Sequence, residues 1–216
     1  MIKQTSQLVK NNKGFILFIL LMVVFRSSLA DFNRVPTGSM KPTIVEGDRI
    51  IINKLAYDLN FPLTQVSIAT IAHPQRGDII VFNSERSQQR LVKRVIGVPG
   101  DQIEMRDNTL YLNQQRLSYT HSSETLMSRD IEEDLFGLKY TVRTAKNAGP
   151  ASNFGPVVVP HAEYFVLGDN RDNSADSRFI GFVPREEVIG RSSSVAFSLN
   201  PDKYYMPRSE RFIKPL

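Results

Sequence analysis

The sequence contains no cysteine among its 216 residues, which excludes disulfide bonds, thiolate nucleophiles and cysteine-ligated metal sites together. This absence leaves the redox compartment undecided, because an exported domain can do without disulfides when its core is large enough. A chain of this length has room for one sizeable core, or for a core with a small subdomain.

Histidine is scarce. His73, His121 and His161 are the three in the chain, and they stand among loop-like residues. Their spacing does not match that of zinc ligands, so we predict no metal site. No histidine lies in a motif-like setting either, which disfavours a Ser-His-Asp triad.

The charge pattern gives no sign of a nucleic-acid partner. The formal net charge is +5 and the isoelectric point is near 9.5, values that permit contact with anionic lipid or nucleic acid. The basic residues are interspersed with acidic ones, however, as on a solvated surface, and no motif combines aromatic with basic residues. We therefore predict that the protein binds no nucleic acid.

The apolar run near the N-terminus is short. Residues 14–25, GFILFILLMVVF, carry no charge, but a membrane span needs about 20 residues. The length of the run also suits the apolar core of a secretory signal, and Ser28-Leu29-Ala30 has the small-x-small pattern of a cleavage site. A removed signal peptide and a retained anchor are both compatible with this local sequence.

We expect a retained transmembrane anchor over 14–30. The segment gives about 25 Å of helix at about 1.5 Å per residue, and Arg26 can extend its charge to the far headgroups. Lysines precede the run, a charge bias that places its N-terminal side in the cytoplasm. These features predict a cytoplasmic tail over 1–13 and an exported domain over 31–216, on the outer side of the cytoplasmic membrane.

From residue 44 onward the pattern is typical of a mainly β protein, with turn residues between β-branched runs. We expect no amphipathic helix beyond the anchor, a long loop over 58–75, and a small inserted β subdomain with mobile loops over 102–160. An acidic cluster stands at 130–134 within that insert. Strands are expected within 47–57, 76–83, 91–117 (with turns at 99–100 and 107–108), 157–170 and 190–199.

Ser39 is the candidate nucleophile. It lies in VPTGSMKPT, residues 35–43, where Pro36 and Pro42 disfavour a regular helix and favour a stiff, extended display. A nucleophile needs such a fixed position. Its place just after the apolar segment fits work at a bilayer surface.

Lys93 is the candidate base, because a serine hydroxyl is a poor nucleophile until a base takes its proton. Lysine can act as that base when apolar surroundings lower its pKa from about 10.4 toward neutrality. Strand alternation puts Lys93 on one face with Leu91 and Val95, and directs Arg94 to the other face, where it stays charged. A strand-edge Lys-Arg pair that extends into solvent is the plainer interpretation of the same residues.

Five segments stand in order along the chain: PTGSMKPT, GDRIIINK, RGDIIVF, LVKRVIGVPGD and GDNRDNSADSRFIGFVP. Together they resemble the motif set of bacterial type I signal peptidases, the membrane-anchored Ser/Lys proteases that remove signal peptides. The match covers the anchor and both ends of the exported domain, whereas 102–160 carries no specific motif. The resemblance implies that family's coiled β core and hydrolysis through an acyl-enzyme, with no cofactor or metal.

The resemblance also implies roles for individual residues. Ser39 matches the nucleophile and Lys93 the general base. Thr37 falls at the position of an oxyanion-hole hydroxyl, and the backbone amide of Ser39 would be the second donor.

Residues near the last motif match supporting positions of the family. Ser174 corresponds to a hydroxyl that orients the lysine. Asp176 and Arg178 match an ion pair beside the site, for which a plain turn salt bridge is the simpler interpretation. Ile180 is a departure, because the family often has an aromatic residue there.

The expected substrates are exported preproteins that carry signal peptides, presented at a phospholipid membrane to a monomeric enzyme. We expect apolar residues near the dyad, such as Val35 and Val92, to wall the substrate pockets. Such walls leave little volume, so small residues should be preferred one and three positions before the cut.

Two other classes stay open. The first is a different Ser/Lys protease with a similar core, such as a self-cleaving repressor or a conjugation-specific maturation peptidase. A repressor should carry a DNA-binding N-terminal domain, where this chain has an apolar segment instead. The second is an anchored β-rich binding protein, in which the motifs serve only as turns and replacement of the serine changes nothing.

Overall fold

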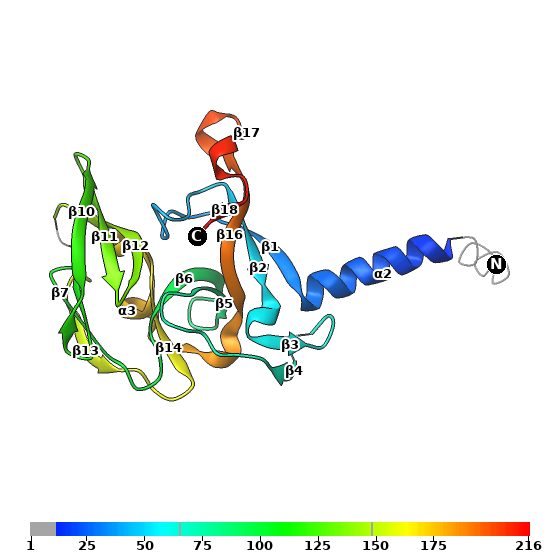
Figure 1. Cartoon of the computed structure of the whole chain (residues 1–216), viewed down its shortest axis with the longest axis horizontal. Helices are drawn as coiled ribbons and strands as arrows, with labels where there is room; N and C mark the ends of the chain where they lie inside the picture. The colour runs from blue at the N-terminus through cyan, green and yellow to red at the C-terminus, as the bar shows by residue number, and fades with distance from the viewer. Residues whose placement is uncertain (1–11, 65, 148) are drawn as a thin grey trace.

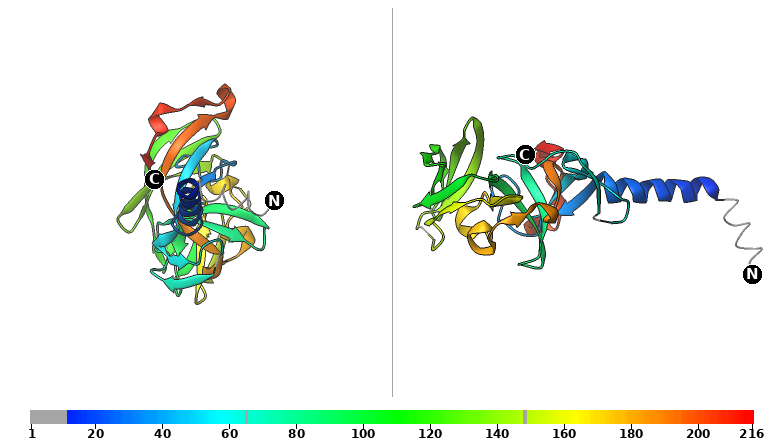
Figure 2. Two further views of the ribbon diagram at one scale, coloured as in Figure 1. Left: turned by 90° about the vertical axis from the view of Figure 1, so that its right-hand side faces the viewer. Right: turned by 90° about the horizontal axis from the view of Figure 1, so that it is seen from below.

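The structure is a computed structural model that describes residues 12–64, 66–147 and 149–216. A β-rich body carries one long helix, α2, which projects away along the long axis of the molecule (Figures 1 and 2). The expected cytoplasmic tail over 1–13 falls outside the described residues, except for its last two positions.

The prediction of a mainly β protein is confirmed. Among the described residues, helical structure is limited to α2 (Lys13–Ser28), α3 (Ser177–Ile180) and the short 3-10 turns η1 (Lys54–Ala56), η2 (Arg171–Asn173), η3 (Arg185–Glu187), η4 (Pro201–Lys203) and η5 (Ser209–Arg211). The strands are β1 (Ala30–Arg34), β2 (Asp48–Asn53), β3 (Asp58–Asn60), β4 (Ser67–Thr70), β5 (Ile79–Ser84), β6 (Gln89–Gly97), β7 (Gln102–Arg106), β8 (Thr109–Leu112), β9 (Gln115–Arg116), β10 (Ser118–Glu124), β11 (Ser128–Leu135), β12 (Leu138–Ala145), β13 (Phe154–Val158), β14 (Glu163–Leu167), β15 (Val183–Pro184), β16 (Val188–Asn200), β17 (Met206–Pro207) and β18 (Lys214–Pro215).

The largest sheet has the order β1-β2-β16-β5-β6-β14-β15, with β17 and β18 added to β16. Its neighbouring strands are antiparallel. β2 shows why such segments form strands, because its isoleucines at 50 and 52 are fully buried and alternate with more exposed positions. The expected strands within 47–57, 76–83 and 190–199 are found as β2, β5 and β16.

Two smaller sheets form the region 102–160, a four-stranded sheet of order β13-β7-β8-β9 and a three-stranded sheet of order β10-β11-β12. Asp107 and Asn108 join β7 to β8 as predicted, and both adopt positive φ, as two-residue hairpins require. Ile96 of β6 and Phe165 of β14 pack in one buried cluster with residues of these smaller sheets. Apolar packing therefore holds the region against the main sheet.

The acidic cluster at 130–134 forms a strand rather than a loop. It lies in β11, which pairs with β10 on one side and with β12 on the other. Glu133 is 0% exposed, although acidic residues are rarely fully buried unless they are paired. Its partners lie in the candidate site described below.

The prediction of a long loop over 58–75 is wrong. The chain forms a hairpin there, in which β3 runs antiparallel to β4. All of the β4 residues are exposed, so no alternation of buried and solvated positions marks this strand. The sequence therefore lacks the period by which a half-buried strand is recognised.

The junction after α2 differs from the predicted anchor over 14–30. The helix ends at Ser28, and Ala30 already pairs with β2. No helix in the described part of the chain is long and apolar enough to cross a membrane. The small-x-small sequence Ser28-Leu29-Ala30 lies at this junction between helix and strand. Ser28 is buried there, and the Leu29 carbonyl accepts a hydrogen bond from the Lys54 amide.

Candidate active site

Ser39 sits in a turn between β1 and β2. The Lys41 amide donates to the Gly38 carbonyl at 3.1 Å, and the Ile44 amide donates to the Met40 carbonyl at 2.9 Å. The expected stiff, extended display is therefore wrong, because a hydrogen-bonded turn rather than an extended segment carries the serine. Met40 is buried beneath this turn.

The loop after β14 fixes the turn from a distant part of the chain. The Asn170 backbone amide donates to the Ser39 carbonyl at 3.0 Å, and its side-chain amide donates to the Gly38 carbonyl at 3.0 Å. Asn170 is itself buried. Two segments separated by about 130 residues are thus held in contact at the candidate nucleophile.

Ser39 and Lys93 are in direct contact. The Lys93 Nζ donates a hydrogen bond of 2.7 Å to the Ser39 Oγ, and Lys93 is only 2% exposed. Leu91 and Val95 pack in one apolar cluster whereas Val92 packs in another, which is the alternation expected for β6. The structure therefore brings the two predicted residues together, Ser39 from the turn after β1 and Lys93 from β6.

Burial lowers the pKa of Lys93 from 10.5 to about 8, although the nearby carboxylates of Asp176 and Asp169 oppose this effect. At mildly alkaline pH a large fraction of such an amine is neutral, and a neutral amine can accept a proton. The 2.7 Å contact is then short enough for transfer from the Ser39 hydroxyl.

Asp176 and Arg178 form a buried ion pair of 2.8 Å near the dyad. The Asp176 carboxylate also accepts the Gly168 amide at 3.0 Å. Arg178 in turn donates to the carbonyls of Ala151 and Arg171. The pair therefore connects three parts of the chain: Gly168 at the start of the loop after β14, Arg171 later in that loop, and Ala151 in the 102–160 region.

Ser174 lies beside Ser39, and a glycine makes that approach possible. A Cβ built on Gly168 would come within 2.3 Å of the Ser174 Oγ and 2.5 Å of the Ser39 carbonyl oxygen, so no larger residue fits. The buried Ser174 Oγ has no hydrogen-bond partner among the described residues. A buried hydroxyl without a partner is costly, so a polar group that came within reach of the Ser174 Oγ would be stabilised.

The remaining predicted residues lie around the dyad in different settings. Thr37 is exposed, two residues before Ser39 in the same loop. Val35 and Val92, the expected pocket walls, are buried in one apolar cluster. Ile180 packs against a separate cluster, so local packing accounts for this residue.

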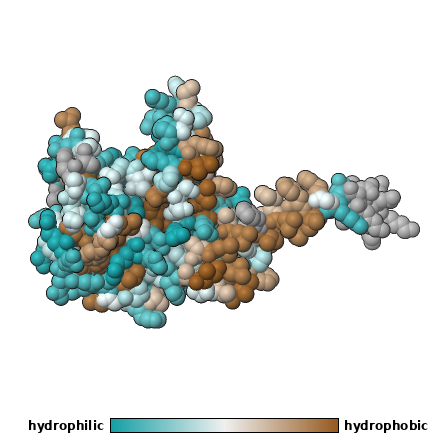
Figure 3. Space-filling view, in the orientation of Figure 1, coloured by the Kyte–Doolittle hydropathy of each residue, from teal (hydrophilic) through white to brown (hydrophobic). Residues whose placement is uncertain are grey.

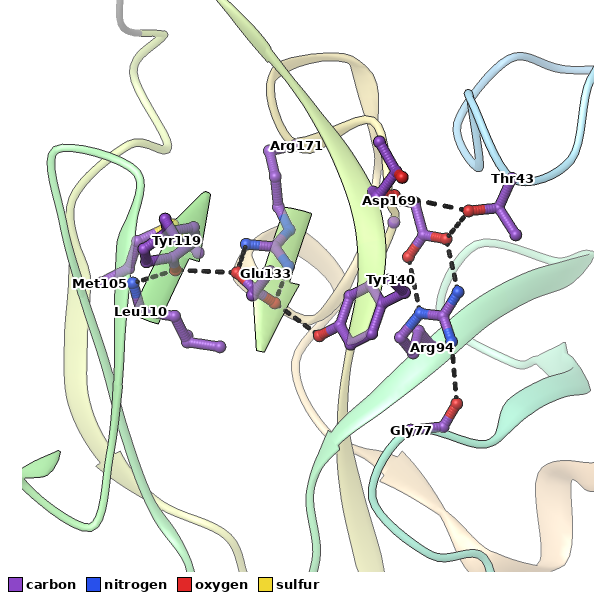
Figure 4. Close-up of polar contacts among 12 residues, drawn as sticks. Thr43, Gly77, Arg94, Met105, Leu110, Tyr119, Glu133, Tyr140, Asp169 and Arg171 are labelled. Carbon is purple, nitrogen blue, oxygen red and sulfur yellow. Dashed lines mark hydrogen bonds and ion pairs between the residues drawn. The ribbon is translucent and has the colours of Figure 1, made fainter. Parts of the chain in front are cut away.

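A buried ion pair stands next to Lys93 on the opposite strand face. Arg94 donates from Nε and Nη2 to both carboxylate oxygens of Asp169, at 2.9 and 2.7 Å, and from Nη1 to the Gly77 carbonyl at 3.0 Å (Figure 4). Thr43, close after Ser39, donates to the same carboxylate. Burial alone would lower the pKa of Arg94, but Asp169 keeps it raised, so this neighbour of Lys93 remains a cation.

The network continues from Arg94 into the 102–160 region (Figure 4). The Arg94 guanidinium lies 4.0 Å from the centroid of the Tyr140 ring, whose hydroxyl donates to Glu133. Glu133 also accepts two hydrogen bonds from Arg171, in an ion pair whose members are both almost fully buried. Tyr119 donates to the second oxygen of Glu133 at 2.8 Å.

Sequence reasoning missed Glu133, Tyr140 and Arg171. Arg171 stands within the GDNRDNSADSR segment, and its charge between two aspartates was the one available signal. Glu133 gives no local signal, because its partners are distant in sequence and its neighbours in 130–134 are also acidic.

The described residues contain no group of three or more His, Cys, Asp and Glu side chains arranged to hold a metal ion. His73 and His161 line a cavity of about 800 Å³ together with Tyr164 and Arg185, whereas Ser39 and Lys93 are not part of its wall. This cavity is therefore separate from the candidate site.

The comparisons with known proteins find relatives of one family. The sequence profile of the family described as signal peptidase, peptidase S26, matches residues 8–197. The chain is 32% identical to signal peptidase I of Pseudomonas fluorescens, over 94% of this chain and 78% of that protein. It is 33% identical to signal peptidase I T of Bacillus subtilis, over 92% of this chain and 90% of that protein.

A crystal structure of a signal peptidase I from Enterococcus faecalis is 38% identical in sequence and covers 56% of this chain and 97% of that chain, with a TM-score of 0.37. Family membership does not depend on that superposition. The family profile spans most of the chain, and the two relatives above align with more than nine-tenths of it. The chain belongs to the S26 family of signal peptidases.

Proposed function

We propose that this protein is a serine endopeptidase that removes signal peptides from exported preproteins, with Ser39 as nucleophile and Lys93 as general base. The observation that carries the proposal is the 2.7 Å contact between the Ser39 Oγ and a buried amine whose pKa is about 8. Family membership supports the substrate class.

The reaction begins with proton transfer from the Ser39 hydroxyl to the neutral Lys93 amine, while the oxygen attacks the scissile carbonyl. The protonated lysine then returns the proton to the leaving amine, and an acyl-enzyme on Ser39 remains. Lys93 then takes a proton from a water molecule that attacks the acyl carbonyl, and returns that proton to the Ser39 oxygen as the acyl group leaves. The Ser39 amide and the Thr37 hydroxyl are the proposed oxyanion donors, each worth about 3–4 kcal/mol in the transition state.

Ser174 and the Asp176–Arg178 pair support the dyad in this proposal. The Ser174 hydroxyl would bond to the Lys93 amine during turnover, which gives its unpaired Oγ a partner. Asp176 holds the Gly168 amide, and through it the close approach of Ser174 to the Ser39 turn. Asp176 and Arg178 are thus positioning residues.

We propose that cleavage takes place at the outer surface of the cytoplasmic membrane. The lysines before the apolar segment favour a cytoplasmic N-terminus and a body on the far side. In this arrangement α2 contacts lipid, and Ser39 follows it closely in the chain. N-terminal sequencing of the membrane-bound protein tests it, because an N-terminus at Asp31 would mean that the segment is cut off.

Substrate side-chain size is the first test of the proposed specificity. Val35 and Val92 belong to a close-packed cluster, so pockets walled by them should admit only small side chains at the first and third positions before the cut. Replacing Ala by Phe at either position of a model preprotein should cost about 1–3 kcal/mol, or roughly 10- to 200-fold in kcat/KM. Equal cleavage of the Ala and Phe versions at the first position would contradict the signal-peptidase proposal, even if the dyad proved catalytic.

The pH dependence of cleavage should follow Lys93. Below pH 8 its amine is protonated and cannot accept the serine proton, so kcat/KM should rise with pH and level off above a midpoint near 8. The measurement is kcat/KM for one preprotein between pH 6 and about 10.5, with stability checked at each pH. A midpoint near 10 would show that the site does not desolvate the amine.

A further inference from the structure

The N-terminal segment of this chain has the layout of a substrate of the proposed reaction. Lysines precede an apolar run over 14–25, and the small-x-small sequence Ser28-Leu29-Ala30 follows it. Every side chain from Phe15 to Val23 is exposed and apolar, and Figure 3 shows this apolar surface along α2. A peptidase that accepts small residues at the first and third positions before a cut would therefore find a site between Ala30 and Asp31.

In the fold this site does not have the form that a peptidase binds. A bound substrate lies extended on both sides of the cut. Ser28 is instead the last residue of α2 and is buried, and Ala30 pairs with Asn53 of β2. Cleavage would require the last turn of α2 to unwind and Ala30 to leave β2. Because β1 is the end strand of its sheet, strand pairing opposes this opening on one side only.

Lys54 holds the junction between α2 and β1 closed. Its Nζ donates to the carbonyls of Arg26 and Ser27 at 3.0 and 2.9 Å. Its backbone amide donates to the Leu29 carbonyl at 3.0 Å. The last carbonyls of a helix have no partner within the helix, so these bonds cap α2 and join it to the turn after β2.

An ion pair also spans the bond between Ala30 and Asp31. The Arg26 Nε donates to the Asp31 carboxylate at 3.0 Å, from α2 on one side of the bond to β1 on the other. The Arg26 side chain is 71% exposed, so solvent screens this pair. Lys54 is partly buried and makes three bonds to the junction, so its amine is the group whose removal should open the junction most.

A copy of the chain cannot bring this junction to its own Ser39 while the site is folded. Val35 lies between Ala30 and Ser39 in the chain and is buried in the apolar cluster that contains Val92. Its amide donates to the Asp48 carbonyl at 3.0 Å. Folding the junction back would pull Val35 out and release the turn that positions Ser39. A cut at Ala30 therefore requires a second copy.

We propose that the Ala30–Asp31 bond is a latent cleavage site for a second copy of this protein, and that Lys54 keeps the site closed. The cut is a hydrolysis, in which water gives Ala30 a carboxylate and Asp31 a free amino group, and the chain loses α2. The inference rests on the proposed function, because Ser39 of one copy supplies the nucleophile for the bond of the other.

Cleavage of an inactive target by the active protein tests the site. Full-length Ser39→Ala/Lys54→Met is mixed with a small amount of wild-type protein, and intact mass and N-terminal sequencing follow the loss of residues 1–30. Ser39→Ala makes the target inactive, so the cut comes from the other copy. We expect cleavage roughly 10- to 100-fold faster than in Ser39→Ala alone, because loss of two charge-assisted hydrogen bonds raises the population of the open junction.

Ser39→Ala/Lys203→Met is the matched control, because Lys203 is exposed in η4 and makes no bond to the junction. It should be cut no faster than Ser39→Ala. Adding Ala30→Phe to the Lys54→Met target should slow its cleavage at least about 10-fold, because Phe overfills a pocket for small side chains. Lys54→Met with Ser39 intact should process a preprotein as the wild type does, which shows that it folds.

Hydrogen exchange measures the opening without cleavage. Peptides that cover 26–32 should exchange faster in Ser39→Ala/Lys54→Met than in Ser39→Ala, and unchanged exchange would overturn the role of Lys54. Equal cutting of the Lys54→Met and Lys203→Met targets by a wild type that processes preprotein would overturn the inference and leave the proposed function standing. A wild type that cleaves no preprotein would reject the proposed function, and the latent site with it.

Discussion

Replacing Ser39 or Lys93 with alanine should each reduce preprotein processing by at least about 10³-fold, because neither member of a nucleophile–base pair works without the other. The double variant should lose no more than the single ones, since the two residues act as a unit. Lys93→Arg should fail as well, because a guanidinium stays protonated and accepts no proton. The measurement is single-turnover cleavage of a model preprotein by the purified protein.

Lys93→Met is the control for folding. Folding lowers the pKa of Lys93 from 10.5 to about 8, so below pH 8 the buried lysine costs about 3 kcal/mol, a cost that disappears as the pH rises above 10.5. Lys93→Met removes that cost and should unfold at a higher temperature than the wild type at pH 7, while remaining inactive. Near-native turnover by Lys93→Arg would show that the lysine is not the base.

Ser39 and Lys93, which are in contact in the structure, could be selected from the sequence because each has a local signal. Lys93 stands between apolar residues of a strand, and Ser39 stands between glycine and methionine in a proline-flanked segment. The conformation at Ser39 could not be predicted in the same way. The prolines exclude a helix, but the turn depends on hydrogen bonds from Asn170, which is far away in sequence.

Two other features could not be predicted, because they depend on the surroundings of the residues in the fold and not on a sequence pattern. The hairpin within 58–75 has no period because both faces of β4 are exposed, so alternation carries no information. Glu133 sits among acids that face solvent more, and the two cations of its network, Arg171 and Arg94, come from other elements. Pairings of that kind depend on the tertiary fold, which a single sequence does not display.

Glu133→Gln should lower the free energy of unfolding by about 3–5 kcal/mol, because it leaves Arg171 buried with an uncompensated charge. Burial alone would raise the pKa of Glu133, but Arg171 and the hydroxyls of Tyr140 and Tyr119 hold it below its ordinary value. The carboxylate therefore contributes its stability above about pH 4.5 and loses it as the pH falls through the lowered pKa. Denaturant unfolding at pH 7 and pH 4 measures both effects.

Glu104→Gln is the matched control, because Glu104 pairs with Arg106 on the surface of the same region and that pair is worth at most about 1 kcal/mol. Arg171→Met combined with Glu133→Gln should recover much of the lost stability, since the buried charge is then gone. If Glu133→Gln cost no more than Glu104→Gln, the ion pair would not be desolvated as the geometry indicates. Arg171 lies in the loop after β14 that also carries Ser174, so a confirmed cost would mean that the 102–160 region contributes a buried charge to the stability of that loop.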